Sequence, residues 1–417
     1  MTTQAATGAA PGATAPGATA PDAHLDPTRP YPLSHVTVVD FTRVLAGPTC
    51  SRMLADAGAR VIKVERPGAG DDTRAMGPFA SDGTSEYYRF ANLGKESIAL
   101  DLTDPDDLAL VRRMIARADV VTENFRPGVM ARLGLAPEDL VRDNPRLVVC
   151  SISGFGQYGP LHQQAAYDTV IQAVSGIMDA TGEADGGPTR VGTSISDILA
   201  GVFGYCGIVT ALAARERTGR GTTVDIAMLD ATFSVMEQGL MDALGVHRRP
   251  HRMGNRHPSM APFDTYRCAD QLLAICVGND RLFGELARAL GEPGWTTDPR
   301  FATNVDRTTN QADLKTVMEA VLGTDSAAAW HDRLEGVGIP VSLVYNVDDT
   351  RSLEQIRTRG MVKDVGGFQV PGTPLKFGAY NSLGTMIPSP GLDDHGPALR
   401  SEFAGAPAAA RGEPGAA

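Results

Sequence analysis

The chain has 417 residues, of which 42% are hydrophobic and 21% are charged, and its formal net charge is −11. These values are ordinary for a soluble protein with more than one core, and the acidic charge argues against a nucleic-acid-binding surface. The five cysteines show no metal-binding spacing, no apolar run approaches the length of a membrane span, and the N-terminus lacks a signal-peptide pattern. We therefore expect a cytoplasmic protein without a metal, whose partners are small molecules rather than a nucleic acid or a membrane.

The first folded elements are expected to form a βαβ unit. Residues 1–32 are rich in Ala, Pro and Gly and predict a disordered tail. A strand, a helix and a second strand parallel to the first follow between residues 36 and 65. Because ligands of such sheets bind at the carboxyl ends of the strands, Val44, Leu45 and Arg66 are predicted to lie at the edge of a ligand crevice.

The alternation of strands and helices then continues. Short strands at 98–102, 119–123 and 147–152 predict a doubly wound α/β domain. Residues 154–159 satisfy the dinucleotide-binding pattern GxGxxG, which keeps a nicotinamide-dependent oxidoreductase as a remote alternative. Since Pro160 delays the next helix, we interpret these glycines as a tight loop that approaches a ligand.

A long apolar helix is predicted from about Asp197 to Arg217. Ser194 or Ser196 could cap its first turn, where free amides and the helix dipole favour an ionised carboxylate. Asp197 could then be a nucleophile for acyl transfer, because attack on a thioester yields a mixed anhydride that a second nucleophile opens. On this segment alone, a carboxylate that only caps a helix is the favoured interpretation, because caps far outnumber catalytic carboxylates.

The second half of the chain predicts a smaller unit. A helix expected at 229–244 is followed by a His- and Arg-rich segment in which Pro250 separates His247 from His251. The proline disfavours the helix that would bring the two histidines together, so no metal site is expected. The expected organisation is a disordered tail at 1–32, a large domain at 33–230, a linker at 231–260, a small α+β domain at 261–345, a segment that returns to the large domain at 346–403 and a disordered tail at 404–417.

Several motifs, in the same order, resemble those of the class III CoA-transferases of the CaiB/BaiF type. The resemblance extends over about residues 33 to 385 and implies a homodimer of two interlocked rings. Each subunit would have a large Rossmann-like domain and a smaller α+β domain. The motifs are Val39 to Pro48, Val61 to Pro67, Glu123 to Gly128, Asn144 to Leu147, Ser153 to Gly156, Thr218 to Gly221 and the pair Val224-Asp225.

The resemblance also implies an activity and a site. Transferases of this family move CoA from an acyl-CoA to a free carboxylic acid through an aspartyl anhydride and an aspartyl-CoA thioester, without a metal or redox cofactor. Their catalytic aspartate matches Asp197. Arg66 and Arg132 would meet the phosphates of CoA. The positions that match CoA-contacting residues of the family are Val44, Leu45, Arg66, Leu100, Asn124, Phe125, Arg132 and Tyr167.

The same family includes α-methylacyl-CoA racemases, which move an α proton with a histidine and an aspartate. This chain has Tyr167-Asp168 where the racemases have the histidine and the residue after it, so transfer is favoured and racemisation stays the alternative. Formyl-CoA transferases carry a run of glycines where this chain has residues 257–262. That difference weakens an oxalate or formate assignment and favours another acid, such as a dicarboxylate or a branched acid.

Overall fold

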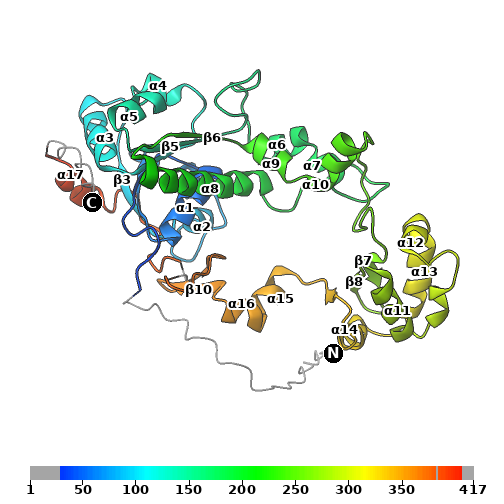
Figure 1. The fold of residues 1–417 in the computed structure, drawn as a ribbon. Helices are drawn as coiled ribbons and strands as arrows, with labels where there is room; N and C mark the ends of the chain where they lie inside the picture. Colours follow the sequence, from blue (N-terminus) through cyan, green and yellow to red (C-terminus); the bar gives the residue numbers. More distant parts are fainter. Residues whose placement is uncertain (1–28, 382–383, 406–417) are drawn as a thin grey trace.

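The computed structural model describes residues 29–381 and 384–405. The tails expected at 1–32 and 404–417 lie almost entirely outside these residues. In Figure 1 a larger part with a central sheet lies apart from a smaller part, and two segments of the chain connect them. The predicted domain bounds stay predictions, because the sheets fix only where the strands lie.

A six-stranded sheet forms the centre of the larger part, with the strand order β3-β2-β1-β4-β5-β6. All neighbouring strands are parallel. This is the doubly wound α/β order, in which ligands bind outside the carboxyl ends of the strands where the order reverses, here between β1 and β4. The α/β prediction is confirmed. The strands are β1 (Thr37–Asp40), β2 (Arg60–Glu65), β3 (Lys95–Ala99), β4 (Val120–Glu123), β5 (Val148–Ser153) and β6 (Thr223–Ala227).

Helices cover both faces of this sheet. One core contains buried residues of α1 (Ala46–Asp56) and α8 (Ile195–Thr218), and the other contains buried residues of α3 (Pro105–Arg117). Val38 belongs to the first core and its neighbour Val39 to the second, as expected for a strand whose two faces are both buried. The other helices of this part are α2 (Glu86–Asn92), α4 (Val129–Arg132), α5 (Pro137–Asp143), α6 (Asp168–Ser175), α7 (Ile177–Ala180), α9 (Met228–Ser234) and α10 (Glu237–Leu240), with a 3₁₀ turn at Asp72–Ala75.

The smaller part contains a three-stranded antiparallel sheet of order β7-β8-β9 packed against helices. The chain then returns to the larger part, where α17 packs against β3 and Arg60 of β2 pairs with Glu402 at 2.7 Å (Figure 1). The elements are β7 (Phe263–Arg267), β8 (Leu272–Cys276), α11 (Asp280–Ala289), a 3₁₀ turn (Pro293–Thr296), α12 (Asn304–Thr309), α13 (Gln311–Leu322), α14 (Ala327–Glu335), β9 (Val341–Leu343), α15 (Val347–Ser352), α16 (Glu354–Thr358), β10 (Val362–Val365), β11 (Phe368–Pro371) and α17 (Gly396–Glu402).

Two elements differ from their predictions. β3 begins at Lys95 rather than at residue 98, because Lys95 and Ser97 are polar but buried and therefore escape a search for apolar residues. The helix predicted at 229–244 ends at Ser234, and short turns replace its second half, including a π-helical turn at Met241–Gly245.

Helix α8 is long and apolar enough, by length and composition alone, to span a membrane. The expectation that no apolar run approaches that length is therefore wrong. The helix packs against α1, α9 and β5, and it contributes Ala200 and Ile208 to the core of the larger part. We therefore interpret α8 as a core helix with one uncovered face, on which Phe203 is exposed.

Candidate active site

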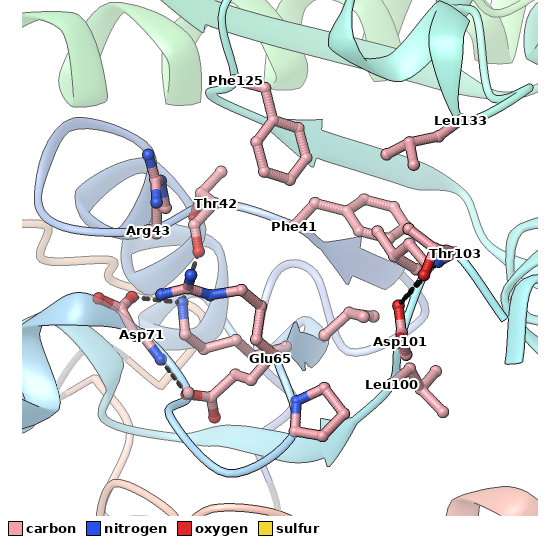
Figure 2. A pocket seen from close by; sticks show the side chains of 16 residues that line it. Phe41, Thr42, Arg43, Glu65, Asp71, Leu100, Asp101, Thr103, Phe125 and Leu133 are labelled. Atoms are coloured by element: carbon pink, nitrogen blue, oxygen red, sulfur yellow. Dashed lines mark hydrogen bonds and ion pairs between the residues drawn. The ribbon is translucent and has the colours of Figure 1, made fainter.

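A cavity of about 450 Å³ lies at the carboxyl ends of β1 to β4. Figure 2 shows Phe125, Phe41 and Leu133 on one side of it and the polar groups of Glu65 and Asp71 on another. An apolar wall beside charged groups suits a ligand with a flat ring and polar substituents.

Three of the predicted CoA-binding residues, Arg66, Leu100 and Phe125, line this cavity. Arg132 is exposed and precedes Leu133, which is part of the cavity wall. Tyr167 lies elsewhere, at the start of α6, with 72% of its surface exposed. The structure therefore places three of the eight predicted CoA-binding residues in the wall of one cavity, and it places Tyr167 next to the other aspartate, Asp168.

Val44, Leu45 and Asn124 lie where the chain passes from β1 into α1. The Asn124 side chain accepts a hydrogen bond from the Arg43 amide at 2.9 Å and donates one to the Arg43 carbonyl at 2.8 Å. Val44 has a φ of +67°, a conformation that a β-branched residue rarely adopts, and its amide donates to Asp71 Oδ1 at 3.2 Å. Leu45 then begins α1, which has no side-chain cap, so the amides of its first turn can meet an anionic oxygen.

Two arginines at the mouth of the cavity share one carboxylate. Arg43 Nη1 lies 3.0 Å from Asp72 Oδ2, and Arg66 Nη2 lies 2.8 Å from Asp72 Oδ1. Exposed ion pairs of this kind contribute little to stability, so either guanidinium can turn to a phosphate at small cost.

Asp197 lies in the first turn of α8, as predicted, but neither nearby serine caps the helix. Ser194 makes no capping hydrogen bond, and the buried hydroxyl of Ser196 has no partner among the described residues. Asp168 Oδ1, on α6, instead accepts a hydrogen bond from the Ser196 amide at 2.9 Å. The cap comes from a neighbouring helix, which no local sequence pattern could indicate.

Asp168 and Asp197 are two neighbouring carboxylates, and their negative charges are not matched by an equal number of cations in the described part of the chain. Burial and then the negative charge of Asp168 raise the pKa of Asp197 to about 7. Asp168 Oδ2 accepts a hydrogen bond from Gln172 Nε2 at 2.7 Å, and Arg190 Nη2 lies 3.8 Å from the same oxygen. Within the described chain no cationic side chain lies within 4 Å of Asp197 itself, so its charge is held without direct compensation.

The start of α8 packs beside the start of α1, where Gly201 lies against Ala46 and Thr49. Asp197 therefore lies at the same edge of the sheet as the cavity, whose wall includes the residues just before α1. Tyr87 of α2 is half-buried, and burial raises its pKa, as do the negative charges of Asp197, Asp71 and Asp168. Sequence reasoning did not single out Tyr87, since one tyrosine in the pair Tyr87-Tyr88 carries no distinguishing signal.

A second cavity, of about 510 Å³, lies between the loop at 183–185, the segment at 253–256 and the smaller part. Acidic and basic side chains both line it, Lys315 pairs with Asp264 at 2.8 Å, and none of the predicted site residues is among them. Over residues 29–381 and 384–405, no group of three His, Cys, Asp or Glu side chains is arranged to hold a metal ion.

Comparisons with known proteins agree on one family. The family model described as CoA-transferase family III matches residues 33–396. An acetyl-CoA:oxalate CoA-transferase of Acetobacter aceti is 48% identical over 374 residues, which are 89% of this chain and 96% of the relative. A succinate–glutarate CoA-transferase of Agrobacterium fabrum is 38% identical over 88% of this chain and 95% of its own. The crystal structure of a CaiB/BaiF family protein from Brucella suis superposes with a TM-score of 0.81 at 38% identity, covering 90% of this chain and 100% of that one.

Proposed function

Because the chain belongs to CoA-transferase family III, and is thus an enzyme that transfers CoA between carboxylic acids, we propose that Asp197 is its nucleophile and that the CoA ester binds in the cavity at β1 to β4. One observation carries this proposal: Asp197, a half-buried carboxylate without a cationic partner among the described residues, begins a helix that packs beside the start of α1, at the edge of the sheet where the cavity lies.

Each step of the reaction exchanges one bond for another. An Asp197 oxygen attacks the acyl carbonyl carbon, the C–S bond breaks, and an anhydride and CoA thiolate result. The thiolate attacks the Asp197 carbonyl of the anhydride, the C–O bond breaks, and the first acid leaves as a carboxylate. The incoming carboxylate opens the aspartyl-CoA thioester, and the same steps in reverse form the new acyl-CoA.

The electrostatics of the site favour these intermediates. Asp197 is charged before the reaction and neutral as an anhydride or thioester. The cost of holding its charge next to Asp168 is therefore relieved when the covalent bond forms. The reaction also needs the ionised carboxylate, so activity is expected to rise with pH through about 7.

The acceptor acid is proposed to be a dicarboxylate. The relatives at 48% and 38% identity are named for oxalate and for succinate and glutarate, which all carry two carboxylates. The similarity to an oxalate transferase outweighs the absence of a glycine run at 257–262, so oxalate is among the candidate acids. Racemisation lacks its histidine base, since the exposed Tyr167 occupies that position and a phenol is a poor proton acceptor at neutral pH.

We also propose that the chain forms the interlocked homodimer of its family. Exposed apolar side chains gather on neighbouring helices of the larger part, and contiguous surfaces of this kind usually meet another protein. In Figure 1 the two parts and the two connecting segments form an open loop of chain, which is compatible with interlocked rings. The exposed residues are Val170 and Val174 of α6, Phe203 of α8, Phe233 of α9, and Val235, Met241, Leu244 and Val246 beyond it.

Replacing the nucleophile tests the proposal. Asp197→Ala is expected to lower transfer by at least about three orders of magnitude while the fold persists. Hydroxylamine added with acyl-CoA should convert Asp197 of the wild-type enzyme to a hydroxamate that mass spectrometry locates. The exposed Asp143→Ala is the matched control and should keep full activity. Transfer by Asp197→Ala near the wild-type rate, or a hydroxamate at Asp168, would contradict the assignment.

A further inference from the structure

Arg190 lies just before α8 on a segment that is fixed to α6. The amide of the next residue, Val191, donates a hydrogen bond to Gln172 Oε1 at 2.8 Å, and Gln172 is fully buried. The other end of the same amide side chain donates to Asp168 Oδ2 at 2.7 Å. The backbone that carries Arg190 is therefore held in a defined position relative to Asp168.

The Arg190 guanidinium, in contrast, is bound only loosely. Its Nη2 lies 3.8 Å from Asp168 Oδ2, which is too far for a hydrogen bond, and its side chain is 46% exposed. Among the described residues Arg190 donates no side-chain hydrogen bond that satisfies geometric criteria. Arg252, which lies nearby on the linker, differs because it donates to the Asp179 carboxylate at 3.0 Å and to the Gly186 carbonyl at 3.0 Å. The donors of Arg252 are therefore committed to the fold, whereas those of Arg190 have no hydrogen-bond acceptor among the described residues.

Charge balance indicates which ligand needs Arg190. The site already contains Asp168 and Asp197, and a dicarboxylate brings two further negative charges. Asp197 is neutral as the thioester, and the attacking carboxylate becomes neutral in the anhydride, but the second carboxylate of the acid stays charged through every step. Among the ion pairs of the described chain, Arg190 is the cation that lies within 4 Å of either aspartate.

We propose that Arg190 binds the distal carboxylate of a dicarboxylate acceptor while the proximal carboxylate attacks the carbonyl carbon of Asp197. The inference rests on the proposed function above and adds the residue that selects the acid. A monocarboxylate has no distal charge and gains nothing from the guanidinium. Arg190 is thus a specificity-determining residue.

The test compares acceptors at a constant donor. Acetyl-CoA is the donor, because its acyl group has no distal carboxylate, and oxalate, succinate and glutarate are compared with acetate, whose isotopic exchange into acetyl-CoA is followed. Arg190→Met is expected to lower kcat/KM for the dicarboxylates by about 10- to 100-fold, the loss of a charge-assisted hydrogen bond. Acetate exchange should change by less than about threefold, and Arg190→Lys should recover part of the dicarboxylate activity. The control is Arg217→Met, an exposed arginine at the other end of α8, which should alter neither.

The possible failures are distinguishable. An equal loss for acetate and the dicarboxylates would overturn the inference, because Arg190 would then support the site rather than the acid. A wild-type enzyme that exchanges acetate but accepts no dicarboxylate would overturn both this inference and the proposed acceptor class. The nucleophile is tested separately, because trapping of Asp197 by hydroxylamine with acetyl-CoA needs no acceptor acid and should proceed in Arg190→Met.

Discussion

Asp40 lies at the carboxyl end of β1 and Asp197 at the start of α8, at the same end of the fold. Their surroundings nevertheless shift the pKa values of the two carboxyls in opposite directions. Burial disfavours ionisation of both. For Asp40, however, the charges of Lys95 and Lys63 and the hydroxyls of Thr42 and Ser51 prevail and lower its pKa to about 2. Asp197 faces a second carboxylate, and its pKa rises to about 7. The comparison shows that burial raises the pKa of an aspartate here unless cationic and hydrogen-bonding partners outweigh it, as they do at Asp40 and not at Asp197.

The environment of Asp40 is a closed network beneath the cavity. Lys95 Nζ lies 3.1 Å from Asp40, and Lys63 Nζ lies 2.9 Å from Asp71, with both lysines fully buried. Lys63 also donates to the Thr42 carbonyl at 2.6 Å, so the network fixes the loop that leads to Val44. Charges that are paired in this way hold the walls of the cavity, and the unpaired Asp197 is left free to react.

The largest expected effect comes from replacing Asp40, the carboxylate that is paired with a buried lysine. Asp40→Asn leaves Lys95 buried without its anion and should lower the free energy of unfolding by about 3 to 5 kcal/mol, measured by urea denaturation at pH 7. Because the folded pKa of Asp40 is below its ordinary value, its contribution is present above about pH 4 and is lost as the pH falls through 2. The deficit of the variant should therefore shrink over that range. A variant as stable as the wild type would contradict the network.

The same substitution at Asp197, which has no cationic partner among the described residues, should raise the free energy of unfolding instead of lowering it. Asp197→Asn removes a charge whose folded pKa lies above its ordinary value, so it should stabilise the protein by about 1 to 3 kcal/mol at pH 8. The cost of the wild-type charge develops as the pH rises from 4 through 7, and the gain should vanish below pH 4. Thermal unfolding of the ligand-free protein across this range is the measurement. Destabilisation at pH 8 would mean that Asp197 has a cationic partner in the assembled enzyme.

The smallest effect is expected from removing the negative charge beside Asp197, which makes its surroundings more like those of Asp40. Asp168→Asn removes the charge that faces Asp197 but keeps an oxygen to accept the Ser196 amide. The pKa of Asp197 should fall, and the acidic limb of the pH profile of kcat/KM should move down by about one unit. Circular dichroism checks that the fold is unchanged. An unmoved profile would show that burial alone raises the pKa of Asp197.

Local patterns in the sequence were enough to predict much of the architecture. Alternation of apolar strands with helices predicted the parallel α/β sheet, and the position of Asp197 in the first turn of a long helix followed from the apolar run after it. These features depend on neighbours within a few residues, so periodicity and capping preferences reveal them. Arg66, which lines the cavity, was predicted because the carboxyl ends of parallel strands meet at one edge, whereas Leu100 and Phe125 were expected there only from the resemblance to the CoA-transferases.

Only the tertiary structure decided how the charges are balanced. The early start of β3 at Lys95, the capping of α8 by Asp168, and the packing of the start of α8 beside the start of α1 all depend on contacts between elements far apart in the chain. A buried lysine or aspartate looks like a surface residue in the sequence, since nothing nearby records the partner that makes its burial tolerable. The place of Asp197 at the start of a long helix was therefore a matter of sequence, whereas the pKa of its carboxyl depends on burial and on the charge that the fold placed beside it.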